Sequence, residues 1–256
     1  MVANYFASPQ ELRDRIEQTF IGAPSNRFHP VIQKIVDGEA TLDHIRGFAR
    51  QFWAIPKYNL AVCGGKASQL QPLPDMPYGT GQPYDMEVQK HFLHIVLDEA
   101  GTEVFPNAPT VSHYELYLRF SDALGIPRSE MERVDLFLPK VIVALHSWVD
   151  MARNLPLVES AIGMNWINET RSSRAGMALE PALRKHYGLS KEAAQFWSAH
   201  GEQDQEHSAI GPYLIEKYAT TLELRERIWI AACRGAAIMQ IILDSVWDEY
   251  FEPRRN

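Results

Sequence analysis

Apolar residues recur at helical spacing along almost the whole chain. Leu116, Phe120 and Leu124 follow one another at four-residue intervals, which places them on one face of a helix. No segment alternates apolar and polar residues convincingly, as a half-buried strand would. The pattern predicts helices over residues 9–20, 30–37, 42–69, 84–100, 113–124, 130–152, 157–171, 175–186, 191–218 and 222–250.

Capping signals and connectors support this division. Serine followed three residues later by glutamate, the capping-box pattern, predicts helix starts at Ser8, Ser112 and Ser129. The connectors carry Gly and Pro, and the longest of them, residues 70–83 and 101–110, are too short to separate domains. We therefore expect residues 1–256 to form a single all-α domain, a bundle of long helices around one core.

The composition narrows the class of protein. Of 256 residues, 46% are hydrophobic, which is enough for one sizeable core, and the net charge of −7 argues against a nucleic-acid partner and an anionic membrane surface. No uninterrupted apolar run reaches the roughly 18 residues of a spanning helix, so we expect no membrane and a cytoplasmic location. Cys63 and Cys233 suit a reducing compartment and suggest no disulfide framework.

One segment holds three metal-ligand residues at helical spacing. His200, Asp204 and His207 are offset by four and seven residues, so their side chains leave one helix face within roughly 60° of one another. Two imidazoles and a carboxylate suit a first-row transition metal. The alternative is that they are solvent-facing polar residues, as the nearby Glu202 and Glu206 suggest.

Residues elsewhere must complete such a site. Glu99 ends one predicted helix and His113 opens the next, while Glu169 follows apolar residues at helical spacing. A carboxylate in apolar surroundings is costly unless it is paired or binds a metal. Other residues of the same types remain open as competitors: Glu159 for Glu169, and His91 and His94 for His113.

The order of these motifs resembles a known family. LDEAG, then SHYELYLRFSDALGI, then a glutamate and H-x3-D-x2-H, is similar to the haem-oxygenase-like diiron oxidases and oxygenases, which are related to the pyrroloquinoline-quinone synthases and thiaminase-like proteins. The loop between the first two motifs is a few residues longer than usual. The resemblance implies a haem-oxygenase-like bundle of about seven core helices. It also implies two iron ions held by Glu99, His113, Glu169, His200, Asp204 and His207.

The resemblance also implies an activity. Relatives use O2 as co-substrate on small amino-acid-like or fatty-acid-like substrates, in oxidative carbon–carbon cleavage or N-oxygenation, and we expect a biosynthetic role. We further expect an external electron donor and a homodimer. Arg171 is a candidate for binding a substrate carboxylate, with a surface salt bridge as the alternative. The residues that could line an apolar pocket, or else form core, are Trp53, Trp148, Trp166, Phe196 and Trp197.

Metal-free relatives leave a second class open. A quinone-synthase-like protein would use the same helical cavity without iron, and a thiaminase-like protein would need a nucleophilic cysteine, for which only Cys63 and Cys233 are available. A true haem oxygenase would use an early histidine, and His29 is the candidate of that kind. Iron content separates these classes.

Overall fold

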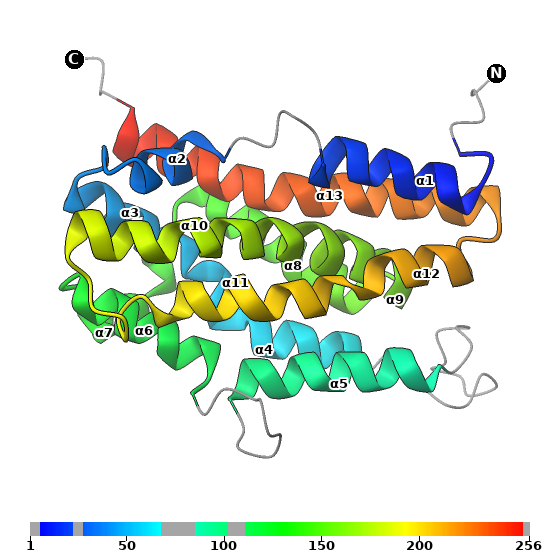
Figure 1. The fold of residues 1–256 in the computed structure, drawn as a ribbon, viewed down its shortest axis with the longest axis horizontal. Coiled ribbons are helices and arrows are strands. Elements are labelled where there is room, and N and C mark those ends of the chain that lie inside the picture. Colours follow the sequence, from blue (N-terminus) through cyan, green and yellow to red (C-terminus); the bar gives the residue numbers. More distant parts are fainter. Residues whose placement is uncertain (1–5, 23–27, 68–84, 102–110, 253–256) are drawn as a thin grey trace.

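The chain folds into helices throughout its described parts. The computed structural model describes residues 6–22, 28–67, 85–101 and 111–252, and these contain no strand (Figure 1). The α-helices are α1 (Pro9–Ile16), α2 (Pro30–Val36), α3 (Leu42–Phe52), α4 (Ala54–Ala67), α5 (Met86–Ala100), α6 (His113–Ala123), α7 (Arg128–Met131), α8 (Pro139–Asn154), α9 (Leu157–Ala161), α10 (Thr170–Tyr187), α11 (Gln195–Ser208), α12 (Ile210–Tyr218) and α13 (Leu222–Val246). Three π-helical segments and one 3-10 turn complete them: η1 (Glu17–Ile21), η3 (Ile162–Glu169), η4 (Trp247–Phe251) and η2 (Val134–Leu136). The expected all-α class is confirmed.

Two predicted long helices are broken, and a proline lies just after each break. The predicted helix 42–69 divides at Trp53 into α3 and α4, and Pro56 is the third residue of α4. The predicted helix 191–218 begins only at Gln195 and divides at Ala209, three residues before Pro212. Proline has no amide hydrogen for the preceding turn, so it is tolerated in a first turn and disfavours a continuous helix.

Two further boundaries differ from the prediction. The predicted helix 130–152 starts instead at Pro139, an N1 proline, after the short α7 and η2. Pro127 caps α7, so the capping box expected at Ser129 is wrong. The predicted gap between 171 and 175 is also wrong, because α9, η3 and α10 follow one another without interruption. Ser173 is buried inside this run and donates to the Gly201 carbonyl at 2.9 Å, which joins α10 to α11.

The other two predicted caps are confirmed. The Ser8 side chain accepts from the backbone amide of Glu11 at the start of α1, and the Ser112 side chain accepts from the amide of Glu115 at the start of α6. The second cap matters for the site, because it fixes His113 as the first residue of its helix.

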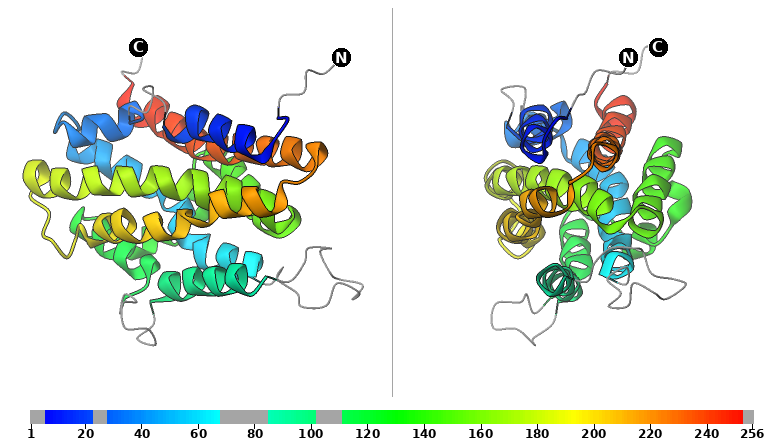
Figure 2. Two further views of the ribbon diagram at one scale, coloured as in Figure 1. Left: turned by 45° about the vertical axis from the view of Figure 1, so that its right-hand side comes forward. Right: turned by 90° about the vertical axis from the view of Figure 1, so that its right-hand side faces the viewer.

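The helices form layers along one direction. In Figure 1, α1 and α13 run along the top, α10 crosses the middle, α11 and α12 lie below it, and α4 and α5 lie at the bottom. Helix α10 packs against α11, η3 packs against α13, and α4 packs against both α5 and α8. The right-hand view of Figure 2 shows the same helices nearly end-on, with α13 near the upper edge. Helix α6 packs against both α5 and α11, and η3 also packs against α11.

The C-terminal helical run is long and apolar. By length and composition, the run Leu222–Phe251 could cross a membrane, with a mean hydropathy of 1.4 over its most apolar stretch. More than half of that stretch is buried within the protein, and Ile228, Ala232 and Ile242 are fully buried. The helix therefore serves as a core helix of this bundle.

Two apolar clusters flank the polar residues of α11. Phe196 and Trp197, which precede His200 on α11, belong to one cluster, whereas Ile210, which follows His207, belongs to the other. The polar residues of α11 lie between these positions along the helix. Burial of the apolar clusters on both sides therefore holds polar side chains in a region from which water is largely excluded.

Candidate metal centre

Four elements bring the six predicted ligands into one buried region. Glu99 lies in the last turn of α5, His113 begins α6, Glu169 ends η3, and His200, Asp204 and His207 project from α11. One ligand atom each from Glu99, His113 and His200 lies within 4.8 Å of the other two. The other three predicted ligands form a neighbouring group, in which His207 Nδ1 is 3.9 Å from both Glu169 Oε2 and Asp204 Oδ1.

Each imidazole of the first group has one nitrogen engaged with protein. His200 Nδ1 lies 2.9 Å from the carbonyl of Phe196, and His113 Nε2 lies 2.7 Å from Gln203 Oε1. These contacts assign the N–H to the engaged nitrogen, which leaves His200 Nε2 and His113 Nδ1 with free lone pairs. His113 Nδ1 is 3.1 Å from Glu99 Oε2 but is not satisfied by a hydrogen bond.

The second group repeats the arrangement. His207 Nε2 lies 2.9 Å from Asp98 Oδ2, so the N–H points at Asp98 and the lone pair of Nδ1 faces Glu169 and Asp204. A carboxylate that orients the remote nitrogen of an imidazole is typical of metal-binding histidines. Asp98 directly precedes Glu99 in the sequence and is nearly fully buried.

A buried lysine orients Glu169 through an amide. Lys66 of α4 is only 1% exposed, and its Nζ donates to Asn165 Oδ1 at 2.5 Å. Asn165 in turn donates through Nδ2 to Glu169 Oε1 at 2.7 Å. The other oxygen, Glu169 Oε2, is buried without a hydrogen-bond partner among the described residues. The chain of contacts therefore engages one carboxylate oxygen and leaves the second for the site.

The π-helical segment η3 sets the position of Glu169. Asn168 donates through Nδ2 to the carbonyls of Gly163, at 2.8 Å, and Gly235, at 3.1 Å. Gly163 and Gly235 let η3 and α13 approach so closely that a Cβ on either would overlap the other helix. A π-helix changes the register of the residues after it, and such segments are frequent at functional sites.

Burial and neighbouring charges shift the pKa values of the predicted ligands in opposite directions. Burial alone would raise the pKa of Glu99, but attraction to His113 lowers that pKa to about 2. Burial and repulsion from His113 both lower the pKa of His200, to about 3. Burial raises the pKa of Glu169, and burial with repulsion from Glu169 and Glu99 raises that of Asp204 well above its ordinary value. Without a cation, Asp204 and Glu169 therefore retain protons more readily than exposed acids do.

The unsatisfied atoms fit a metal. Buried atoms without a hydrogen-bond partner among the described residues include His113 Nδ1, His207 Nδ1, Glu169 Oε2 and Asp204 Oδ2. Leaving such groups unpaired costs about 1–3 kcal/mol each, and more for charged ones. Imidazole nitrogens and carboxylate oxygens are ligands for iron and similar metals, so binding a cation would offset these costs.

The competing residues lie elsewhere or have other partners. Glu159 is buried beside Arg227, with 3.2 Å between Oε1 and the Arg227 Nε. His91 Nε2 contacts the carbonyl of His207, and His94 Nε2 is 3.7 Å from Asp98, so both lie behind the imidazole of His207. Glu202 and Glu206 are exposed, as expected for residues outside the ligand face.

The residues suggested for metal-free or haem chemistry also have other roles. Burial raises the pKa of the Cys63 thiol strongly, which disfavours a thiolate nucleophile. The other cysteine, Cys233, is half-buried, and burial raises its pKa as well. His29 accepts from the amide of Val31 through Nδ1 and contacts Asp244 Oδ1 through Nε2 at 3.0 Å, so it caps α2 with both nitrogens engaged.

Sequence reasoning missed the residues behind the ligands. Asp98, Gln203, Lys66 and Asn165 contact the predicted ligands directly or through one intermediate. Helical spacing offered a signal for one of them, since Asn165 is four residues before Glu169. Nothing in the sequence joins Lys66 to Asn165, because their contact links α4 to η3.

A cavity of about 750 Å³ reaches the first group of ligands. Its walls include Glu99, His113 and His200, together with Arg171 and Arg174 of α10. Of the aromatics predicted to line a pocket, Phe196 and Trp197 do so, whereas Trp53, Trp148 and Trp166 are buried in the core. The volume is typical of a small-molecule site.

Comparison with known proteins agrees with the fold and with iron chemistry. Residues 46–239 match a family described as iron-containing redox enzyme. The chain is 22% identical over 223 residues to the 4-aminobenzoate synthase of Nitrosomonas europaea, covering 87% of this chain and 85% of that protein. It is 23% identical over 228 residues to the pyrroloquinoline-quinone synthase of Cronobacter sakazakii, covering 88% and 80%.

A solved structure from Shewanella denitrificans, described as a domain of unknown function with a heme oxygenase-like fold, has a TM-score of 0.65 to this structure. The match covers 94% of this chain and 90% of that one at 17% identity. The expected haem-oxygenase-like bundle is therefore confirmed.

Proposed function

The chain belongs to the iron-containing redox enzyme family, and from this premise we propose that it is a non-haem diiron oxidase or oxygenase. One observation carries the proposal. Three imidazoles, of which those of His113 and His207 are buried and that of His200 is half-buried, each have one nitrogen engaged by an acceptor of the protein. The other nitrogen of each is left for a site that also contains the buried carboxylates of Glu99 and Asp204 and the half-buried carboxylate of Glu169. That combination matches the ligand chemistry of iron and the usual support behind metal-binding histidines.

The proposal divides the ligands into two groups. Glu99, His113 and His200 would hold one iron ion. The second iron ion would bind to Glu169, Asp204 and His207. The ligand roles rest on the convergence of these side chains and on their unsatisfied atoms.

Two bound ferrous ions would supply the reduction of O2 coupled to oxidation of a carbon or nitrogen centre. Full reduction of O2 takes four electrons, and cleavage or N-oxygenation of the substrate provides two of them, so an external donor would supply the other two. The protein's own residues would hold the substrate in the cavity and exclude water. Phe196 and Trp197 form an apolar wall next to His200 and would restrict side reactions with solvent.

The wider setting of this activity is also part of the proposal. We propose a small-molecule substrate, either amino-acid-like or fatty-acid-like, in a biosynthetic pathway. The names of the two related synthases support a biosynthetic role. We propose further that the enzyme is a cytoplasmic homodimer and binds neither nucleic acid nor membrane.

A metal-free, quinone-synthase-like activity is the alternative, and the similarity to a pyrroloquinoline-quinone synthase favours it. Two carboxylates argue against it. Glu169 and Asp204 each have an oxygen 3.9 Å from His207 Nδ1, and without a metal this arrangement has no evident role. Thiaminase-like chemistry is disfavoured by the burial of Cys63.

Anaerobic titration of iron-free protein with ferrous ion tests the proposal. We expect two ions to bind per chain and to raise the rate of O2 consumption in the presence of a reductant. Asp204→Ala serves as the site variant and Glu202→Ala as the exposed control on the same helix. If the wild-type protein bound no more iron than the Asp204→Ala protein, the diiron function would be refuted and the metal-free alternative favoured.

A further inference from the structure

We propose that Arg171 binds the carboxylate of a substrate in the 750 Å³ cavity, away from the metal ligands, and this inference rests on the proposed function. The apolar body of the substrate lies between aromatic and aliphatic side chains, and its opposite end reaches His200. The substrate class is therefore a mono-anionic carboxylic acid with an apolar chain or ring, oxidised at a position remote from the carboxylate.

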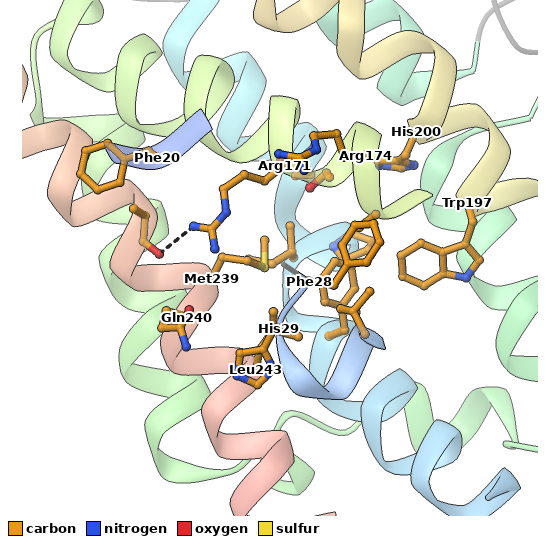
Figure 3. A pocket seen from close by; sticks show the side chains of 18 of the residues that line it. Phe20, Phe28, His29, Arg171, Arg174, Trp197, His200, Met239, Gln240 and Leu243 are labelled. Carbon is orange, nitrogen blue, oxygen red and sulfur yellow. Dashed lines mark hydrogen bonds between the residues drawn. The ribbon is translucent and has the colours of Figure 1, made fainter. Parts of the chain in front are cut away.

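Arg171 is a half-buried cation that has no carboxylate partner among the described residues. Among the described residues, no acidic side chain forms an ion pair with it, and its guanidinium makes only a long contact, 3.5 Å from Nη1 to the carbonyl of Ala236. Figure 3 shows the side chain extending from α10 into the cavity toward this carbonyl. An unpaired guanidinium in a cavity is costly to desolvate, and a ligand carboxylate would remove that cost through two parallel hydrogen bonds.

The surrounding charges favour an anion at this place. Arg174 follows one turn later on α10, lines the same cavity and donates from Nη1 to the Ile21 carbonyl at 3.1 Å. Burial and repulsion between the two guanidinium groups lower the pKa of Arg171. A carboxylate near Arg171 would relieve that repulsion, whereas an amine would increase it.

The remaining walls suit an apolar body. The apolar residues that line the cavity include Phe20, Phe28, Ile32, Phe52, Met239 and Leu243. In Figure 3, Arg171 lies near Phe20 and Met239, while His200 and Trp197 lie together on the other side of the view. A cavity with a cation at one end, metal ligands at the other and apolar residues in its walls is expected to bind a chain or ring that spans the two ends.

The position of Arg171 also separates it from the metal ligands. It lies two residues after Glu169, so the two side chains leave their helix roughly 200° apart. Glu169 faces His207, whereas Arg171 faces the cavity. A carboxylate at Arg171 is thus held by the protein and not by the metal.

Calorimetric titration of the metal-free protein with octanoate, octanol and octylamine tests the anchor. We expect octanoate to bind most tightly and Arg171→Met to weaken it by about tenfold or more, the effect of losing charge-assisted hydrogen bonds, with little change for octanol. Arg171→Lys should restore part of the affinity. Arg184→Met removes an exposed arginine of the same helix, paired with Glu180 at 3.0 Å, and should have no effect.

Two results would overturn the proposal. One is octanol binding to the wild-type protein as tightly as octanoate. The other is unchanged octanoate affinity in a folded Arg171→Met protein. Since these titrations contain no metal, an Arg171-dependent octanoate site together with failed iron binding would reject the diiron function and leave the anion site standing.

The orientation has its own test. With Mn²⁺ bound, as verified by metal quantitation, the paramagnetic ion should relax the terminal methyl protons of octanoate faster than the protons next to its carboxylate. The reverse order would place the carboxylate at the metal and reject the proposed orientation. Glu202→Ala protein should give the same order as wild type, because Glu202 is exposed.

Discussion

The imidazole of His207 is held through its Nε2 by Asp98, with Oδ2 at 2.9 Å, so that its Nδ1 faces Glu169 and Asp204. This contact joins α11 to α5 and fixes both the tautomer and the orientation of the ring. Partners of this kind commonly contribute a factor of roughly 10–100 to metal affinity.

We therefore expect Asp98→Asn to lower the affinity for one of the two iron ions by about tenfold or more while leaving the other nearly unchanged. Competition with a chelator of known affinity measures both constants. His94→Ala is a suitable control, because His94 lies farther from the same carboxylate, at 3.7 Å, and its side chain is more exposed than that of His207. Equal loss at both sites would contradict the conclusion that Asp98 supports the iron site of His207 and not the other one.

The ligand face of α11 can be separated from its exposed face. His200→Ala, Asp204→Ala and His207→Ala should each abolish binding of at least one iron ion, because each removes a ligand. Glu202→Ala and Glu206→Ala should bind iron normally, since both side chains are exposed. Iron quantitation reports binding, and circular dichroism reports whether the helices remain. A folded Glu202→Ala protein that loses iron would show that the face assignment is wrong.

The Lys66–Asn165 pair predicts a non-additive effect on stability. Asn165→Leu should lower the free energy of unfolding by about 3 kcal/mol, because it leaves a buried ammonium without its acceptor at 2.5 Å. Lys66→Met combined with Asn165→Leu should recover much of this loss, since removing both partners is often nearly neutral. Chemical denaturation of the iron-free proteins measures both. If the loss of unfolding free energy in the double variant equalled the sum of the losses in Lys66→Met and Asn165→Leu alone, the two residues would not be directly coupled.

The close approach of η3 and α13 gives a packing prediction. A Cβ at Gly235 would overlap the Gly163 carbonyl, so Gly235→Ala should lower the free energy of unfolding by about 1–3 kcal/mol. It should also weaken iron binding, because η3 ends at Glu169. Gly64→Ala is the matched control: nothing lies within 4 Å of its added Cβ, and alanine is the better helix former. Equal melting temperatures for the two variants would contradict the packing account.

The helices and the ligand face could be predicted because both depend on local spacing. The periodicity of Leu116, Phe120 and Leu124 and the cap at Ser112 correctly placed the start of α6. The spacing of His200, Asp204 and His207 correctly placed them apart from Glu202 and Glu206. Breaks near Pro56 and Pro212 were missed, although the prolines were visible, because apolar periodicity continues across them.

The supporting residues Asp98, Gln203 and Lys66 could not be predicted, because their contacts join segments far apart in the sequence. Asp98 meets His207 across 109 positions, and Lys66 meets Asn165 across 99. Such pairs depend on how α4, α5, η3 and α11 pack, which helical periodicity does not specify. The long loop after Glu99 falls at 102–110, outside the described residues.

The buried acids predict how iron binding depends on pH. Burial raises the pKa of Asp204 and Glu169, and nearby carboxylates raise the pKa of His113 and His207 against the opposing effect of burial. The iron-free protein therefore holds protons that a metal must displace. Iron affinity should rise with pH up to the raised values, and binding should release protons. Titration in weak buffer with a pH indicator measures them, and the absence of release near neutral pH would contradict the assignment.

The same shifts predict the stability of the iron-free protein. A carboxyl with a raised pKa stabilises the fold fully at pH values below its unfolded pKa of about 4, and that contribution is lost as the pH rises through the folded value. The lowered pKa of Glu99, about 2, acts only in acid and does not alter this trend above neutrality. Asp204→Asn replaces the carboxylate by a neutral group, so it should raise the melting temperature of the iron-free protein at pH 8 relative to wild type. At pH 5 the difference should be smaller, because Asp204 is then more fully protonated. A difference that stays constant between the two pH values would show that Asp204 titrates as an ordinary exposed acid and is not held in a charge-poor site.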